Sequence, residues 1–442
     1  MTALETIASV DVCVVGSGSA GSTAAIAAAR NGARVLLVEK LPFLGGTSTA
    51  VLDTFYGFYT PGDRPRKIVA GIADDVVDGL RRLGPVVERP NTYGAGTGVT
   101  YVADHLKVAW ERLVEDSGAA VILHAFLQAV EVEDRRARAI AVATKAGLRR
   151  IEARVFVDAT GDADLCAFAG FGHELAGEVE PAQSLTTTFR MANVDVARRR
   201  TLAREGFHAL MAEAAETGAY DLPRREGSDH ITPIDGVTAT IMTRVAPTEA
   251  IDGALVNATD PAFLTRAEVA GRRQALEYAR FLVDRVPGYE GASLVGLGTQ
   301  VGVRETRRVY GDYRLTRDDV LAARAFEDAV GLSGAPIEDH GAGPGTRWEY
   351  LPDAAAVGIP YRTLLVRDAA NVLVAGRCFS ATHDAQAAVR SMAQCMAMGQ
   401  AAGTAAAMSI GASADPRDVP AAALRERLRA AGAIVDAAGV PA

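Results

Sequence analysis

The stretch VCVVGSGSAG at residues 12–21, followed by VLLVEK at residues 35–40, decides the fold of this chain. Its first four residues form an apolar run suited to a buried parallel strand, and glycines follow at positions 16, 18 and 21. Glu39 stands at the end of the second apolar run. This spacing predicts a strand, a tight turn, a helix and a second strand that together bind an adenine dinucleotide.

Each glycine in this stretch has its own physical task. Gly16 permits the tight turn, Gly18 lets the backbone approach a pyrophosphate, and Gly21 lets the helix pack closely on the strand. The alanine-rich run that follows favours a helix ending near Gly32, with its N-terminal N–H groups directed at the phosphates. The Glu39 carboxylate can accept hydrogen bonds from ribose hydroxyls. The expected contacts of this unit with the cofactor are Gly16, Ser17, Gly18, Ser19, Ala20, Gly21, Glu39 and Lys40.

The composition of the chain limits the class of protein. A length of 442 residues is enough for two or three structural domains, and the net charge of −8 argues against a nucleic-acid partner. The four cysteines include no CxxC pair, which argues against a disulfide scaffold, a zinc site and a dithiol centre. We find no secretory signal pattern and no apolar run long enough to span a bilayer, so we expect a cytoplasmic protein.

The first part of the chain continues as an α/β pattern. Apolar residues recur at helical spacing in 66–84 and in 102–118, and three short strand-like segments follow within 128–157. They end in ARVFVDATGDADL (153–165), an apolar strand that runs into a glycine turn. Alternating strands and helices of this kind indicate an α/β domain.

The middle of the chain, from about residue 176, has a different character. We expect a strand at 184–191 and helices at 197–218 and 262–286, without a glycine-rich nucleotide turn. We therefore assign this part to a separate, substrate-facing domain. An apolar run ending in a glycine and a small-residue helix then reappear within 371–408, and we place them back in the first domain.

Several motifs together give the chain a family likeness. They are GSGSAG (16–21), EK followed by LGGTST (39–49), DATGDADL (158–165), VGVRETRRVYGDY (301–313) and VAGRCFSATHDAQAAVRSMAQCMAMGQAAG (374–403). With them the chain resembles the FAD-dependent oxidoreductases related to the succinate dehydrogenase and fumarate reductase flavoproteins, within the glutathione-reductase-like class. The likeness runs from the first strand to about residue 408 and is weakest in the middle section.

The resemblance implies an α/β fold with two domains. One is a Rossmann-like FAD-binding domain with a parallel sheet and a small β-meander, formed discontinuously by residues 1–175 and 350–442. The other is an inserted α+β substrate domain, or cap, at residues 176–349. The substrate would bind between the two domains.

The resemblance also implies which further residues hold FAD. The LGGTST segment would follow the isoalloxazine edge, the ATG turn would lie near the adenosine diphosphate, and the AGR segment would meet the ribityl chain. The start of the last long helix would direct its dipole at the flavin O2. The residues implied in this way are Gly45, Gly46, Thr47, Ser48, Leu127, Ala159, Thr160, Gly161, Gly376, Arg377, Ser391 and Met392.

One departure from some relatives bears on how FAD is attached. Those relatives bind FAD covalently through a histidine beside the LGGTST position, whereas the nearest histidine in this chain is His105. We therefore expect non-covalent FAD.

Three residues are candidates for the chemistry beside the flavin. His383 resembles a substrate-contacting histidine that follows the AG motif in related flavoproteins, and an imidazole suits proton transfer near neutral pH. Arg390 could bind a substrate carboxylate or negative charge on the flavin, and its alternative is a salt bridge with Asp384. Arg304 is the third candidate, with the alternative that it only pairs with acids along a strand. His340 lies in a glycine-rich loop and could belong to a lid.

These observations predict an FAD-dependent dehydrogenase or reductase acting on a small polar, carboxylated or hydroxylated metabolite. The electron acceptor or donor is unidentified. A monooxygenase or oxidase that uses dioxygen is the first alternative, and a protein that binds FAD structurally or as a sensor is another. No hydrolase, nucleotide-triphosphatase or metal motif is present in the sequence.

Overall fold

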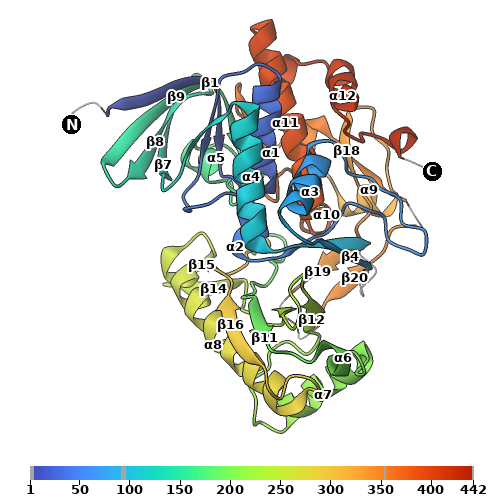
Figure 1. Cartoon of the computed structure of the whole chain (residues 1–442). Helices are drawn as coiled ribbons and strands as arrows, with labels where there is room; N and C mark the ends of the chain where they lie inside the picture. Colours follow the sequence, from blue (N-terminus) through green and yellow to red (C-terminus); the bar gives the residue numbers. More distant parts are fainter. Residues whose placement is uncertain (1–3, 91–95, 342, 344, 353–354, 441–442) are drawn as a thin grey trace.

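The computed structural model describes residues 4–90, 96–341, 343, 345–352 and 355–440. Two bodies lie one above the other in Figure 1, and the first and last described residues both belong to the upper one. Among the described residues, no helix has both the length and the apolar character needed to cross a membrane.

A largely parallel sheet forms the centre of the upper body. Its order is β6 (Ala120–Ile122), β2 (Val35–Val38), β1 (Thr6–Val15), β9 (Gly147–Asp158), β8 (Arg136–Thr144) and β7 (Phe126–Glu133), with β22 (Val372–Val374) also paired to β9. β1 runs parallel to β2 and β9, and Val12 lies opposite both Val35 and Val155. All four residues of β2 are buried, which explains why that run is wholly apolar.

The strands β7, β8 and β9 form an antiparallel extension of this sheet. They correspond to the three strand-like segments expected within 128–157. β9 serves two purposes, because one end pairs with β8 while its C-terminal end pairs in parallel with β1 and β22. That parallel end delivers Asp158 and the turn that follows it to the carboxyl edge of the sheet, beside the end of β1.

Two helices with many small residues pack against each other over one face of the sheet. They are α1 (Ser19–Arg30) and α11 (Met392–Ala412), which lie side by side in Figure 1. A Cβ on Gly399 would stand 2.1 Å from the carbonyl oxygen of Ala20, and one on Gly403 would stand 2.1 Å from that of Ala24. Glycine at these two positions is what lets the two helix backbones meet. The helices α3 (Ile72–Leu83) and α4 (Ala103–Ser117) lie beside α1.

The lower body is an antiparallel sheet covered by helices. Its strand order is β12 (Ser228–Ile231), β13 (Thr238–Ile241), β11 (Phe189–Ala192) and β16 (Ser293–Leu297). The long helix α8 (Pro261–Arg285) matches the helix expected at 262–286. The side chains of Phe189, Met211, Tyr278 and Phe281 belong to its own hydrophobic core.

Two expectations for this region are corrected in detail. The strand expected at 184–191 is regular only in β11, because residues 185 and 186 form isolated bridges instead. The helix expected at 197–218 is divided into α6 (Val196–Arg199) and α7 (Arg204–Glu216). Between them the Thr201 hydroxyl donates to the carbonyl of Arg198 over 2.8 Å, a local bond of the kind that competes with helical structure.

The remaining elements connect the two bodies or cover their edges. β10 pairs with β17, and β18 pairs with β21 and packs on α11, so β17 and β18 join the upper body. The bounds of these elements are α2 (Thr47–Ala50), β3 (Thr54–Phe55), β4 (Val87–Pro90), β5 (Thr97–Thr100), α5 (Asp164–Phe168), β10 (His173–Leu175), β14 (Thr248–Ile251), β15 (Ala254–Asn257), β17 (Arg307–Val309), α9 (Arg317–Leu321), β18 (Ala329–Ser333), β19 (Ile337–Asp339), β20 (Arg347–Glu349), β21 (Val357–Pro360), α10 (His383–Val389) and α12 (Ala421–Ala430).

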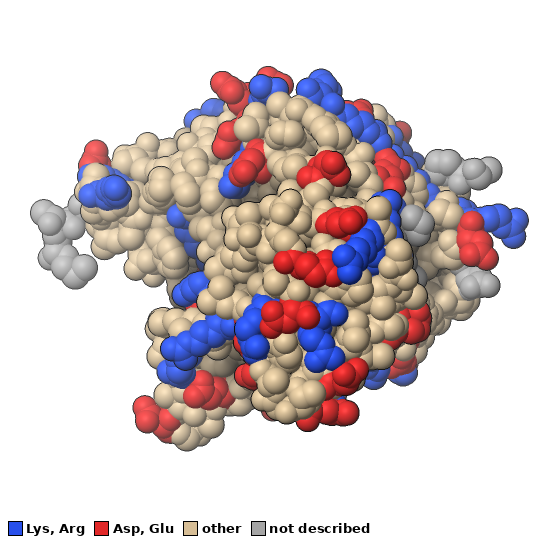
Figure 2. Space-filling model, turned by 60° about the horizontal axis from the view of Figure 1, so that its bottom comes forward, with Lys and Arg blue, Asp and Glu red and all other residues tan. Residues whose placement is uncertain are grey.

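Charged side chains of both signs are mixed on the underside of the molecule. Figure 2 turns that side forward and shows Lys and Arg lying among Asp and Glu. On α8, for example, Arg280 pairs with Glu277 over 2.6 Å and Arg285 pairs with Glu213 of α7 over 2.8 Å. These ion pairs illustrate how charges of opposite sign alternate over this side.

Candidate functional site

A cleft of about 320 Å³ lies between the two bodies. One wall is built by the carboxyl ends of β1, β2 and β9 with the loops that follow them, and by the start of α11. The other wall comes from β12, β13 and the segments around residues 303 and 338, and Arg390, which stands just before α11, reaches this wall through Gln183. The carboxyl edge of a parallel sheet is where such folds usually bind ligands.

The glycine turn after β1 has the geometry that its sequence predicts. Gly16 has φ +92°, and a Cβ there would stand 2.4 Å from the carbonyl oxygen of Ala159. A Cβ on Gly21 would stand 1.7 Å from the carbonyl oxygen of Gly16. A Cβ on Gly18 would meet no protein atom within 4 Å, although Gly18 lines the cleft. The packing of the protein therefore requires glycine at positions 16 and 21, whereas Gly18 leaves space for a ligand in the cleft.

The Glu39 carboxylate holds this turn together. It accepts hydrogen bonds from the Ser17 backbone N–H over 2.8 Å and from the Ser17 hydroxyl over 2.6 Å. Its other oxygen accepts from the N–H of Leu41 over 2.8 Å. Glu39 is buried and lines the cleft, so its carboxylate shapes the turn in addition to facing the site where we expect a ribose.

Most residues proposed from the sequence line this one cleft. They come from six separate segments of the chain, which the fold brings together. These residues are Gly16, Ser17, Gly18, Ser19, Ala20, Glu39, Lys40, Gly46, Thr47, Leu127, Ala159, Thr160, Gly161, Arg304, Gly376, Arg377, Arg390, Ser391 and Met392.

Four residues proposed from the sequence lie outside the lining of the cleft. Gly21 is occupied in packing α1 against the turn, as described above. The Gly45 N–H donates to the carbonyl of Ser17 over 2.8 Å, and the buried Ser48 hydroxyl donates to the carbonyl of Gly45 over 2.7 Å. These two residues shape the LGGTST segment from behind. His383 is the fourth and lies deeper in the protein.

Arg377 lies directly beside the ATG turn. Its Nη2 pairs with Asp162 Oδ1 over 2.5 Å, and a Cβ on Gly161 would stand 2.5 Å from its Nη1. Its buried Nε has no hydrogen-bond partner among the described residues. Burial raises the pKa of Asp162, but Arg377 and Lys40 outweigh it and the net pKa is lowered. The pair thus places a fixed positive charge and a carboxylate at the middle of the cleft.

The opposite wall carries three guanidinium groups without acidic partners. Arg224, Arg304 and Arg390 all line the cleft, and no carboxylate of the described residues lies within ion-pair distance of any of them. Burial lowers the pKa of Arg304 well below its ordinary value, and the neighbouring charges of Arg390 and Arg224 lower it further. Burial also lowers the pKa of Arg390. These groups are held in charged form only at a cost in solvation.

A chain of amide groups holds two of these arginines in position. Arg390 Nη2 donates to Gln183 over 3.0 Å, and Gln183 donates to Gln386 over 3.1 Å. Gln386 donates to the carbonyl of Arg304 over 2.9 Å, and Arg304 Nη1 donates to the carbonyl of Ser184 over 2.7 Å. The alternative that Arg390 pairs with Asp384 is not realised, because Asp384 pairs with Arg347. Neutral partners therefore orient both guanidinium groups and leave their charge uncompensated.

Glu338 and His340 stand on the same wall, and sequence reasoning identified only the second of them. His340 Nε2 lies 2.9 Å from Glu338 Oε1, and its Nδ1 lies 3.1 Å from the Thr346 hydroxyl. Burial, followed by the charge of Arg304, lowers the pKa of His340 well below its ordinary value. Burial raises the pKa of Glu338, but His340, Arg390 and Arg304 together lower it to about 2. Glu338 is thus a carboxylate on which Arg304 and Arg390 both act without forming an ion pair.

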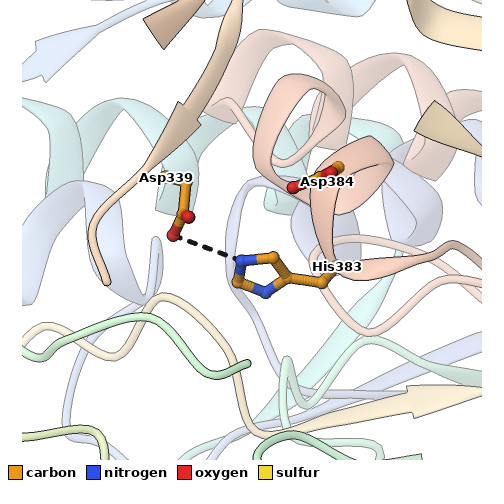
Figure 3. Close-up of side chains that lie close together, drawn as sticks. All are labelled: Asp339, His383 and Asp384. Carbon is orange, nitrogen blue, oxygen red and sulfur yellow. Dashed lines mark ion pairs between the residues drawn. The ribbon is translucent and has the colours of Figure 1, made fainter. Parts of the chain in front are cut away.

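His383 is held between two carboxylates. Its Nδ1 lies 2.8 Å from Glu305 Oε2 and its Nε2 lies 3.2 Å from Asp339 Oδ1, the contact marked in Figure 3. Burial lowers the pKa of His383, but the two carboxylates raise it to about 9. Asp384, the third side chain of the view, pairs with Arg347, which also pairs with Asp339. This arrangement favours a charged His383 that ties α10 to its surroundings.

A histidine that sequence reasoning set aside also reaches the cleft. His230 of β12 lies with its Nε2 2.8 Å from Oδ1 of Asp53, which precedes β3 in the upper body. The partners are 177 residues apart in sequence. Only the alternation of β12, in which Asp229 turns toward Arg199 and Tyr289, could have suggested that His230 faces the other way.

Comparisons with known proteins agree with this geometry. The model of the family described as FAD dependent oxidoreductase matches residues 11–428. A fumarate reductase (cytochrome) from Shewanella frigidimarina is 44% identical over 59 residues, which are 13% of this chain and 10% of that protein. A digeranylgeranylglycerophospholipid reductase from Thermoplasma volcanium is 28% identical over 193 residues, 42% of this chain and 48% of that protein. The matches therefore span at most about half the length of these curated relatives.

Solved structures of similar fold were also found. A geranylgeranyl bacteriochlorophyll reductase-like protein from Thermoplasma acidophilum is 13% identical, and the match covers 97% of this chain and 84% of that one with a TM-score of 0.45. The anhydrotetracycline hydroxylase from Streptomyces rimosus is 13% identical. The match covers 96% of this chain and 65% of that one with a TM-score of 0.47.

Proposed function

The chain belongs to the FAD-dependent oxidoreductase family, and we propose that it transfers a hydride between FAD and a small carboxylate-bearing substrate bound in the cleft. FAD would lie along the wall formed by the upper body. The substrate would lie against the arginine-rich wall. The residues that line the cleft, described above, support this assignment.

The residues of the upper wall fit a bound FAD. The open side of Gly18 leaves room for a pyrophosphate at the start of α1, where the backbone N–H groups and the helix dipole favour negative charge. Ser19 Oγ and Arg377 Nε are buried without hydrogen-bond partners among the described residues. Buried polar atoms normally have partners, so a bound ligand would supply them here. We propose that the adenosine half lies by Glu39 and Leu127 and the flavin by Gly46, Thr47 and Met392.

The inserted region would then act as the cap of the site. We propose that the part of residues 176–349 that forms the lower body supplies the substrate-facing wall, with β12 and β13 closing over the flavin end, while β17 and β18 of the same range belong to the upper body. Val51 supports this arrangement, because its carbonyl accepts a hydrogen bond from the Thr188 hydroxyl of the inserted region. A cap of this kind would exclude water from the space between substrate and flavin.

The observation that carries the substrate class is the set of unpaired guanidinium groups. Arg224, Arg304 and Arg390 face the cleft, and Glu338 is the acid that their charges influence most directly. Buried positive charge without a carboxylate partner is costly, and an anionic ligand removes that cost. The planar guanidinium group also matches a carboxylate in a two-point hydrogen-bonded contact.

When bound, FAD supplies two-electron hydride chemistry at its N5 atom. The chain's own residues would bind and orient the substrate beside it. Arg304 and Arg390 would hold the substrate carboxylate, and the amide chain through Gln183 and Gln386 would fix the two guanidinium groups at one angle. Such fixed donors stabilise negative charge without having to reorganise during the reaction.

The test is anaerobic reduction of the purified yellow protein by defined compounds. L-Lactate, L-malate and glycolate are compared with glucose and with butylamine, and fumarate is added to dithionite-reduced protein. We expect bleaching by at least one hydroxy acid, or reoxidation by fumarate, and no response to the neutral sugar or the amine. Air is then admitted, since rapid formation of peroxide or of an oxygenated product would favour the oxidase or monooxygenase alternative.

A different pattern would contradict the proposal. Bleaching by the sugar or the amine, with no response to any carboxylate, would reject the carboxylate class. Failure of the purified protein to bind FAD on reconstitution would remove the premise itself.

A further inference from the structure

We propose that His230 is the proton acceptor and donor of the cleft and that Asp53 is its positioning residue. The inference rests on the proposed function, in which a substrate lies against the flavin. It assigns the proton transfer to a residue of the inserted region. It also replaces His383, the histidine that sequence reasoning favoured, in that role.

The first argument is the contact between the two side chains. His230 Nε2 lies 2.8 Å from Asp53 Oδ1, and the side chains are 7% and 5% exposed. His230 stands on β12 of the lower body, whereas Asp53 stands between α2 and β3 of the upper body. The pair is therefore formed only when the two bodies are together, and it stands at the cleft between them.

Asp53 is held in the ionised, carboxylate form. Burial raises the pKa of this carboxyl group, but His230, Arg190 and Arg89 outweigh burial and the net pKa is lowered. Its Oδ2 has no hydrogen-bond partner among the described residues, and Arg190 Nε lies 4.0 Å away. An ionised carboxylate can only accept hydrogen bonds. His230 must then donate from Nε2, which leaves the lone pair of a neutral ring on Nδ1.

The Nδ1 atom of His230 is open to a ligand. Both hydrogen bonds of the His230 ring involve Nε2, and Nδ1 has no partner among the described residues. His230 lines the cleft together with Val51 and Leu52. These two residues follow Thr47, where we place the flavin edge, and lead directly to Asp53. The open nitrogen is thus available to a molecule in the cleft near the flavin.

The surroundings of His230 contain few other charged or titratable groups. Asp53 and the Thr54 hydroxyl approach it from the upper body, and Arg190 of β11 lies behind Asp53. Arg89 of β4 donates to the Tyr56 hydroxyl over 3.2 Å, and both line the same part of the cleft. The carboxylate of the adjacent Asp229 is committed to Arg199 over 2.7 Å. Asp53 is the acid in direct contact with the ring.

The other two histidines of the region are less available to a substrate. His383 lies outside the lining of the cleft, between Glu305 and Asp339, although its Nε2 makes only an ion-pair contact with Asp339 over 3.2 Å and no hydrogen bond. His340 has Glu338 at one nitrogen and Thr346 at the other. Of the three, His230 is the one that combines a fixed donor nitrogen with an open acceptor nitrogen, which is the usual arrangement of a general base oriented by a carboxylate.

The proton and electrons balance as follows for a hydroxy acid. FAD, when bound, would accept the electron pair of the substrate C–H bond as hydride and so would be reduced. The substrate O–H bond breaks, its proton moves to Nδ1 of His230, and its electron pair forms the C=O bond. The imidazolium ion is stabilised by Asp53 and later releases the proton to water. In the reverse direction protonated His230 returns the proton to the substrate.

The kinetic test uses His230→Gln, because glutamine can still donate to Asp53 but does not titrate. Anaerobic stopped-flow reduction of FAD by L-lactate, L-malate and glycolate is measured from pH 5 to 9. We expect the reduction rate to fall by about 10²–10⁴-fold and the acid limb of the pH profile to disappear. FAD content and the binding of malonate, a carboxylate that cannot be oxidised at a hydroxyl group, should be unchanged. His105→Gln, outside the cleft, is the matched control.

A second measurement judges the pair without turnover. NMR of the protein with ¹⁵N-labelled histidine should show the Nε2–H tautomer for His230, a response of its signals to malonate, and a weaker preference for that tautomer in Asp53→Asn. An Nδ1–H tautomer, or no response to malonate, would overturn the inference. So would a His230→Gln protein that is reduced as fast as wild type with the same pH profile. If no hydroxy acid reduces wild-type FAD and fumarate does not reoxidise the reduced protein, that outcome contradicts the proposed function, and the NMR result alone decides for or against the pair.

Discussion

The two walls of the cleft are built on different principles. On the upper wall, glycines and alanines let backbone segments touch, and the contacts at Gly16, Gly21 and Gly399 are too close for any Cβ. On the opposite wall, charged side chains from distant segments converge, and Arg304 and Arg390 have no acidic partner there. The first wall is fixed by sterics and the second is held by hydrogen bonds around uncompensated charge. Binding of the cofactor and choice of the substrate are thus assigned to different physical interactions.

The largest effect is expected at the steric wall. Gly21→Ala would place a Cβ 1.7 Å from the carbonyl oxygen of Gly16, so the helix and the turn cannot both keep their positions. We expect loss of bound FAD together with a marked loss of stability, measured by flavin absorbance and by thermal unfolding. Gly18→Ala is the matched control, because its Cβ meets no protein atom within 4 Å. It should fold like wild type and lose FAD affinity alone, and a Gly21→Ala protein with full FAD content would break the comparison.

A paired buried arginine should behave differently from the unpaired ones. Arg308 is 1% exposed and pairs with Glu174 over 2.7 Å, with Glu180 over 2.7 Å and with Glu305. Arg308→Met would remove the buried cation that the three carboxylates share, leaving Arg314 beside Glu174 and Glu180 and His383 beside Glu305. We expect a loss of about 3–5 kcal/mol in the free energy of unfolding, measured by urea denaturation. A change below about 1 kcal/mol would show that the cluster is hydrated and adds little to stability.

The pH dependence of stability tests the role of His383. Its pKa is raised to about 9 in the folded protein, so its contribution is fully present below about pH 6.5, the ordinary value, and is lost as the pH rises through 9. The contribution is on the order of 3 kcal/mol. We expect His383→Gln to be less stable than wild type at pH 6, with a difference that shrinks toward pH 9.5. An equal difference at both pH values would mean that His383 is neutral in the folded protein.

The smallest effect on stability is expected at an unpaired arginine, and its sign is reversed. The pKa of Arg304 is lowered by burial and by Arg390 and Arg224, so the charged group opposes folding. Arg304→Met should therefore raise the melting temperature of the FAD-loaded protein by a few degrees, about 1 kcal/mol. The same variant should bind malonate about tenfold more weakly. A lower melting temperature with unchanged malonate binding would show that Arg304 is a structural residue.

The sequence predicts the upper wall better than the lower one for a physical reason. Gly18, Gly21 and Glu39 act within one continuous strand, turn, helix and strand at residues 12–40, so their spacing carries the information. The pairing of Asp53 with His230 depends on how two bodies meet across 177 residues, and no local pattern encodes it. His383 shows the same limit of prediction from sequence. Its place after the AG motif is suggestive, but Glu305 and Asp339, which raise its pKa, come from elsewhere in the chain.

Arg390 and Arg304 lie between these two cases. Their motifs place them near the expected flavin, and both line the cleft. Whether a guanidinium group is free or paired depends on which acids fold beside it, as Arg308 and Arg304, four residues apart, illustrate. The sequence motif predicts the location of these residues, whereas the tertiary structure determines their charge environment.

The most direct test of the account is a malonate titration of the FAD-loaded protein, followed by the visible absorbance spectrum of the flavin. We predict a saturable shift of the flavin bands in wild type, and its loss in Arg304→Met and Arg390→Met proteins that retain full FAD content. No shift in wild type, or the same shift and affinity in both variants, would contradict the claim that an anionic substrate binds to these arginines beside FAD.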